Sequence, residues 1–150
     1  MRPYILLAAL VLALAGIALV AGDAMTQLKA KADAARGGEQ AKLCLEYARQ
    51  ELERAASLYN EGQFDQAKAE IEQVVAYAHK GEDAATASGK QLTQTEIKLR
   101  KLAERMHDIG NSLDFEDRGP MKQAIGQIEQ LRSDLLLKMW GPQAEPKGRS

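Results

Sequence analysis

The sequence predicts an all-α protein in which elongated helical hairpins share a long central helix of about residues 63–113. The chain is rich in Ala, Leu, Glu, Gln and Lys, which favour helix, and only 5% of its residues are aromatic, a low share for a β-rich protein. Apolar or small residues also recur at alternating spacings of three and four without an intervening proline, a pattern typical of a helix packed on other helices. These positions are Phe64, Ala67, Ile71, Val74, Ala78, Gly81, Ala85, Ser88, Leu92, Thr95, Leu99, Leu102, Met106, Ile109 and Leu113.

The middle of this helix is the weakest part of the pattern. Gly81 and Gly89 each cost a helix interior about 1 kcal/mol relative to alanine, and Ala85, Ser88 and Thr95 offer little apolar surface. We therefore predict either one continuous helix or two collinear helices hinged between Gly81 and Gly89. If the hinge closes instead, the same segments form the alternative architecture, a compact up-down four-helix bundle.

Length, charge and cysteine content exclude several classes of protein. A chain of 150 residues is long enough for one domain. The net charge of -1 gives no basic surface of the kind that binds nucleic acid. The single cysteine, Cys44, rules out an internal disulfide. It lies beside an apolar stripe and is interpreted as a small buried hydrophobe, with a reactive or dimer-forming thiol as the alternative.

Residues 1–22 have the organisation of a secretory signal peptide. Arg2 is followed by an uncharged, apolar run over 5–22 that ends in small residues. Cleavage is expected before Asp23 or before Met25, which would place the mature protein in the periplasm or outside the cell. The alternative is an uncleaved membrane anchor, because the run is close to the minimum of about 18 residues for a membrane-spanning helix.

The mature chain is expected to begin with a spacer and then enter an all-helical domain over 39–141. Residues 23–38 have few large apolar side chains and contain Gly37-Gly38, so we predict a flexible or helical spacer there. A helix over 39–61 should end at Gly62, which is suited to the left-handed conformation that follows many helices. Its apolar stripe consists of Leu45, Ala48, Leu52, Ala55 and Tyr59.

The turn at Gly62 has a distinctive spacing of small and large residues. Ala67 follows it by five positions, Ile71 by nine and Val74 by twelve. This spacing resembles the middle of a tetratricopeptide repeat, over about one repeat at residues 45–78, although no second copy follows at a 34-residue period. The resemblance implies a tight pair of antiparallel helices around the Gly62 turn.

The second half of the chain is predicted to form one further hairpin. A helix over 120–139 should begin at Pro120, which suits a first helical turn, and fold back on 92–113. Phe115, in the connection, is expected to tuck against a helix end. The apolar stripe of the last helix consists of Met121, Ala124, Ile128, Leu131 and Leu135. Residues 142–150 contain no large apolar side chain and predict a disordered tail.

The sequence contains no catalytic, cofactor-binding or metal-binding motif, so we expect a protein that is not an enzyme and name no site residue of these three kinds. His79 and His107 lie beside the apolar stripe of the central helix and are expected to face solvent. The acidic pairs at 82–83 and 116–117 lie near expected bends and helix ends, and are interpreted as solvated charges rather than acid/base pairs.

The predicted function is that of an exported, non-enzymatic helical protein that acts as an interaction or scaffold module in the bacterial cell envelope. The partner is expected to be a protein, with a homo-oligomer as one option and no role for nucleic acid. One alternative is a four-helix bundle that binds haem or metal. Another is a small periplasmic holdase chaperone, because the stretch 92–96 is similar to the Leu-Thr-x-x-Gln motif of such chaperones, with Glu96 in place of the glutamine.

Overall fold

The computed structural model describes residues 22–141, and this part of the chain is helical almost throughout. A first helical segment covers residues 22–34. It is followed by α2 (Gly37–Asn60), α3 (Phe64–Ser88), α4 (Leu92–Ser112), a short 3-10 helix η1 (Phe115–Asp117) and α5 (Arg118–Trp140). No strand occurs within residues 22–141, so the predicted all-α class is confirmed. The expected signal peptide or anchor before residue 22 and the expected tail after residue 141 lie outside the described residues.

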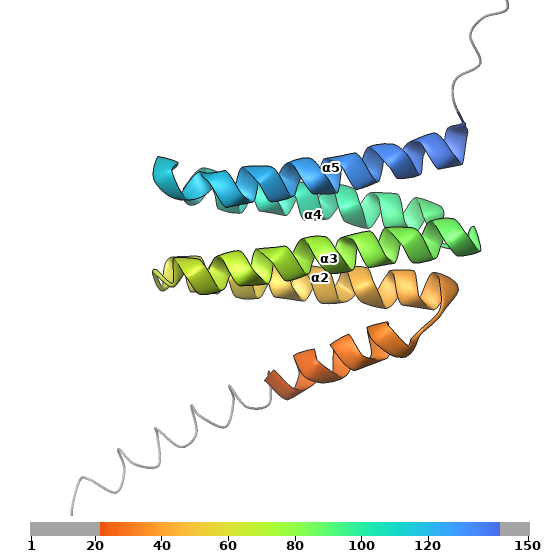
Figure 1. The fold of residues 1–150 in the computed structure, drawn as a ribbon, viewed down its shortest axis with the longest axis horizontal. Helices are drawn as coiled ribbons and strands as arrows, with labels where there is room; N and C mark the ends of the chain where they lie inside the picture. The colour runs from red at the N-terminus through yellow and green to blue at the C-terminus, as the bar shows by residue number, and fades with distance from the viewer. Residues whose placement is uncertain (1–21, 142–150) are drawn as a thin grey trace, which may run out of the picture.

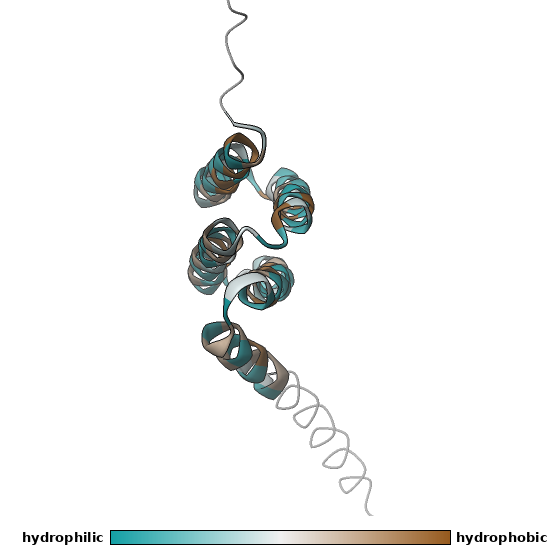
Figure 2. Ribbon diagram, turned by 90° about the vertical axis from the view of Figure 1, so that its right-hand side faces the viewer, coloured by the Kyte–Doolittle hydropathy of each residue, from teal (hydrophilic) through white to brown (hydrophobic). Residues whose placement is uncertain are grey.

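Successive helices reverse direction and form two stacked hairpins (Figure 1). In the first hairpin α2 packs against α3, and in the second α4 packs against α5. The end-on view in Figure 2 shows the stacking, with α2 beside α4 and α3 beside α5. The helices placed side by side between the hairpins are therefore parallel, whereas those within a hairpin are antiparallel.

The predicted continuous helix over 63–113 is wrong, and so is its collinear, hinged form. One helix ends at Ser88 and the next begins at Leu92. Gly89 and Gln91 both have left-handed backbone conformations, with φ of 66° and 62°. Two such residues within three positions turn the chain back on itself, as the compact alternative requires.

Gly81, expected at the hinge, lies inside α3 at the closest approach of α2 and α3. A Cβ atom at Gly81 would lie 3.1 Å from the Leu45 Cγ atom, 3.2 Å from the Ala41 carbonyl oxygen and 3.3 Å from the Cys44 Cβ atom. Ala41 and Ala85 are fully buried on the same stretch. The small residues that predicted weak packing therefore allow the two backbones to approach closely.

The apolar stripes predicted from the sequence form the core of both hairpins. Each of the residues assigned to the stripes of 39–61 and 120–139 is buried. The largest side chains with almost no exposed surface come from all four long helices, so one continuous core joins the hairpins. These side chains are Leu52, Val74, Leu99, Met106, Met121, Ile128 and Leu135.

Phe115 does not tuck against a helix end, since 82% of its surface is exposed. The end of α4 is instead covered by the Arg118 side chain. The Arg118 guanidinium donates hydrogen bonds to the carbonyl oxygens of Leu113, at 2.8 Å, and Asn111, at 3.3 Å. A side chain that satisfies these otherwise unpaired helix-end carbonyls is stabilising there, whereas a phenyl ring is not.

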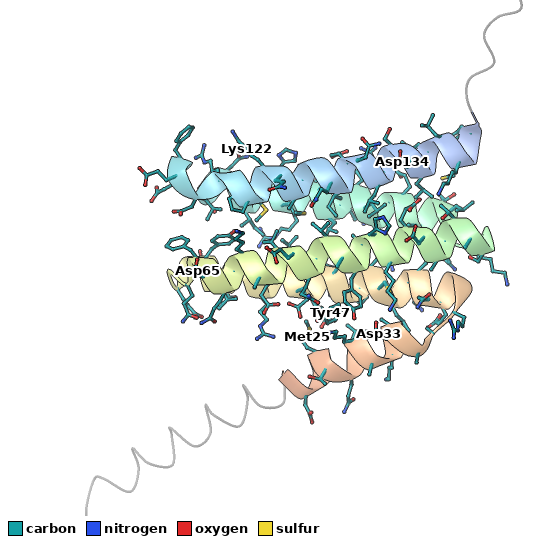
Figure 3. All side chains as sticks on the ribbon, viewed as in Figure 1. Met25, Asp33, Tyr47, Asp65, Lys122 and Asp134 are labelled. Atoms are coloured by element: carbon teal, nitrogen blue, oxygen red, sulfur yellow. The ribbon has the colours of Figure 1, made fainter. Side chains whose placement is uncertain are left out.

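Residues 23–38, expected to be a flexible or helical spacer, are helical over 23–34 and again from Gly37. The segment 22–34 packs on the first hairpin, where Ala32 is fully buried. Asp33 accepts hydrogen bonds from the Tyr77 hydroxyl at 2.8 Å and from the Lys80 ammonium at 2.7 Å. The view in Figure 3 shows Met25 and Asp33 of this segment on the side of α2 that carries Tyr47.

We expect Gly81→Ala to destabilise the protein by about 1–3 kcal/mol, because the added methyl group overpacks the α2–α3 contact. Urea unfolding monitored by circular dichroism measures the change. The matched control is Gly126→Ala in α5, where nothing lies within 4 Å of the added Cβ atom. This control should gain up to about 1 kcal/mol from helix propensity. Equal gains in both variants would show that the α2–α3 contact has room for a methyl group.

We expect Leu52→Ala to cost about 2–5 kcal/mol of unfolding free energy, because it empties a fully buried position in the first hairpin. Leu137→Ala in α5 makes the same chemical change at a site that is 57% exposed, and should cost less than about 1 kcal/mol. The same unfolding experiment compares them. A similar, small cost for both would place Leu52 outside the core.

Candidate functional site

One hollow on the described surface is the groove between α2 and α4, which is lined by residues of both helices. These parallel helices make far fewer contacts with each other than α2 makes with α3. The groove has a volume of about 200 Å³ and an apolar floor of Leu45 and Leu52 from α2 and Leu102 from α4. Since the three leucines are at most 5% exposed, the floor belongs to the core and is held in place by it.

Charged side chains from both helices form the rim of this α2–α4 groove. The α2 side contributes Glu46, Arg49 and Glu53, which are spaced by three and four and therefore lie on one helical face. The α4 side contributes Lys98, Lys101 and Arg105, with the same spacing. Four cations and two anions leave the rim with a net charge of +2, although the whole chain carries -1.

Two ion pairs order the rim. Arg105 of α4 forms a two-point hydrogen bond to the Glu53 carboxylate of α2, with N–O distances of 2.8 and 3.0 Å, and so connects the two hairpins across the groove. Arg49 binds Glu46 one turn away at 2.6 Å. Hydrogen bonds from these arginines hold the pKa of each carboxyl below its ordinary value. Both acids are therefore ionised at neutral pH, and Lys98 and Lys101 supply the excess positive charge.

Three acidic residues are withdrawn from solvent, and the sequence analysis predicted burial for none of them. Glu51 and Glu82 are each only 3% exposed, and the Glu70 side chain is 19% exposed. The interpretation of residues 82–83 as a pair of solvated charges is wrong for Glu82, whose pKa is raised by burial and whose carboxylate lies 3.5 Å from the Lys138 Nζ atom. Asp83 is exposed and lies 2.9 Å from the His79 Nδ1 atom.

A helical-position argument could have found Glu51. It follows Ala48 by three positions and precedes Ala55 by four, so it lies on the apolar face of its helix. The position of Glu82, four after the buried Ala78, carries the same signal. An acidic residue on an apolar helical face is costly to bury unless its carboxylate is paired.

The other residues considered for chemistry have ordinary surroundings. His79 and His107 are exposed. Cys44 is fully buried, and burial raises the pKa of its thiol to about 11, so the thiol is protonated and unreactive at neutral pH. Within residues 22–141, no three His, Cys, Asp or Glu side chains are grouped so as to hold a metal ion.

None of the helices between residues 22 and 141 combines the length and the apolar character needed to span a membrane.

Comparisons of the chain with protein-family models, with curated proteins and with solved structures found no match.

We expect the α2–α4 groove to bind 8-anilinonaphthalene-1-sulfonate, since this probe has an apolar ring system for the leucine floor and an anionic group for the lysines of the rim. The Lys98→Gln/Lys101→Gln variant should bind it several-fold more weakly in a fluorescence titration. Lys68→Gln/Lys122→Gln removes the same charge from exposed positions outside the groove and should bind as the wild type does. Equal weakening in both variants would indicate a general charge effect.

Proposed function

We propose that this chain is an exported, non-enzymatic helical protein that acts as an interaction module in the bacterial cell envelope. The α2–α4 groove carries the proposal, because it combines an apolar floor with a charged rim in the manner of a protein-binding surface. The apolar run over 5–22 supports the assignment to the envelope.

The chemistry of the groove favours an acidic protein segment as its partner. One apolar side chain of the partner would pack on Leu45, Leu52 and Leu102, and carboxylates beside it would face Lys98 and Lys101. Burying one leucine-sized side chain contributes about 1.5–3 kcal/mol, and each exposed ion pair contributes about 0–1 kcal/mol. Since a stable complex buries about 800 Å² on each partner, the bound segment would have to extend along the α2 and α4 ridges beyond the groove itself.

We also propose that the α2–α3 hairpin is related in geometry to a tetratricopeptide repeat. Gly62 has φ of 73° in the turn between the two antiparallel helices. Ala67, Ile71 and Val74, the other residues of the resemblance, are all at most 2% exposed. These features support the resemblance over residues 45–78.

The alternative functions have less support from the arrangement of the side chains. A bundle that binds haem or metal would use inward-facing His residues, whereas both histidines of the chain are on the surface. A holdase chaperone would present a broad apolar surface. Phe115 and Trp140 are the two most exposed aromatic residues within 22–141. Phe115 precedes α5 and Trp140 is its last residue, so they lie at opposite ends of the helix and do not form one patch.

The proposal predicts that an envelope protein is retained by the immobilised chain and lost when the charge of the groove is reversed. Envelope extract would be passed over the wild type, over Lys98→Glu/Lys101→Glu and over Lys68→Glu/Lys122→Glu, and the bound proteins identified by mass spectrometry. Circular dichroism would first establish that all three are folded.

The wild type and the Lys68/Lys122 control should retain the same partner, and the groove variant should lose it at least tenfold. A photo-crosslinking residue at position 101 should label that partner, and one at position 122 should not. Retention of the same proteins by all three variants would refute the assignment of the groove as the binding surface.

A further inference from the structure

The α4–α5 connection carries an exposed aromatic side chain with a carboxylate on either side. Phe115 is the most exposed large apolar residue within 22–141, with 82% of its surface in solvent, and the neighbouring Asp114 and Glu116 are exposed too. Neither acid forms an ion pair with another described residue. Folding of a single chain therefore leaves the phenyl ring in water, where burial against another molecule is favourable.

The connection is held in one conformation before any partner binds. The Arg118 guanidinium donates hydrogen bonds to the carbonyl oxygens of Leu113 and Asn111. The Asp117 backbone N–H donates another to the Asp114 carbonyl oxygen at 3.0 Å. A segment that is fixed in advance loses little conformational entropy when it binds. Figure 1 shows the connection at the end of the bundle, where a second molecule can approach it.

The α2–α4 groove is complementary to this connection in size and in charge. Its floor is apolar and its volume is about 200 Å³, and an apolar cavity of about 150 Å³ is large enough to bind benzene. On its rim, Arg49 and Arg105 are bound to acids, whereas Lys98 and Lys101 form no ion pair with the described residues. The groove thus offers an apolar seat beside two ammonium groups, and the connection offers a phenyl ring between two carboxylates.

The Phe115 ring does not lie in the groove of its own chain. The groove is lined on α4 by residues from Lys98 to Arg105, whereas Phe115 follows the end of α4 at Ser112. The helix between Arg105 and Ser112 is about 10 Å long, and the high exposure of the ring shows that it fills no groove within one chain. A second copy of the chain can present the same segment from outside.

We propose that the α2–α4 groove binds the α4–α5 connection of a second copy of the chain. The Phe115 ring packs on the leucine floor, and the carboxylates on either side of it face the lysines of the rim. This inference rests on the proposed function, because it names the acidic protein segment that the groove receives. Every copy carries both surfaces, so the contact repeats from copy to copy unless two copies make it reciprocally.

Photo-crosslinking in cells tests this contact on the full chain. A photoreactive phenylalanine analogue at position 115 should yield a product of twice the mass of the chain. Mass spectrometry should place the crosslink on residues 45–53 or 98–105 of the second copy. The same analogue at position 140 is the control, because Trp140 is 77% exposed at the other end of α5 and should give no such product. A crosslink from position 115 to a different region, or the absence of the product, would overturn the proposal.

A complementation experiment separates the two surfaces. One copy carries the analogue at position 115 and the reversed rim Lys98→Glu/Lys101→Glu, while a second, tagged copy keeps its groove and carries Phe115→Ala. We expect these copies to crosslink to each other when they are made together, and the first copy not to crosslink to itself. Adding the reversed rim to the tagged copy should reduce the product at least tenfold, whereas adding Lys68→Glu/Lys122→Glu, at exposed positions, should not. Equal yields with both tagged variants would show that the groove does not receive the connection.

The outcomes distinguish failure of this contact from failure of the proposed function. The proposed function fails if the reversed rim leaves the set of retained envelope proteins unchanged. The contact between copies alone fails if the reversed rim removes an envelope protein while position 115 gives no crosslink to a second copy.

Discussion

The close contact of α2 and α3 at Gly81 is the constraint on which the remaining structure depends. With Leu45, Ala41 and Cys44 all within 3.1–3.3 Å of where a Cβ atom would stand, this contact fixes the separation and the register of the two helices. That register brings Tyr47 and Tyr77 together, with ring centroids 4.4 Å apart, on the face that receives the segment 22–34. The opposite face of the hairpin is left to α4 and α5.

The two long faces of α2 differ in the size of their side chains, and this difference produces the groove. Toward α3, α2 presents Ala41, Cys44 and Ala48, all fully buried, and the backbones approach closely. Toward α4 it presents Leu52, with Glu46, Arg49 and Glu53 along the edge. Leu45 lies between the two faces, because it contributes to the groove floor and also contacts Gly81 of α3. Large side chains and long charged ones hold α4 away from α2. The α2–α3 interface is therefore closely packed, whereas the α2–α4 interface between the hairpins leaves a groove.

The sequence was sufficient to predict the all-α class and most core residues, because both depend on periodicity within one helix. The reversal at Gly62 was predicted from the turn residue itself. The break between α3 and α4 was not predicted. Ser88 and Leu92 are four positions apart, so the 3-4 spacing of apolar or small residues continues without interruption although the chain reverses direction between them. Gly81 was misjudged because helix propensity measures only its local cost, whereas its role depends on the residues it meets in α2. The α2–α4 groove joins two helices, and no pattern within one helix specifies such a pairing.

The order in which the helices pack also bears on how fast the chain can fold. Among the described long helices, extensive contacts join only consecutive helices or next-but-one helices in the chain. Each hairpin can thus close its own short loop before the two hairpins meet, and the loop-closure entropy at each step is small. Helical proteins with such short sequence separations between contacting residues fold in microseconds to milliseconds. A chain with this topology would spend little time with its apolar stripes exposed.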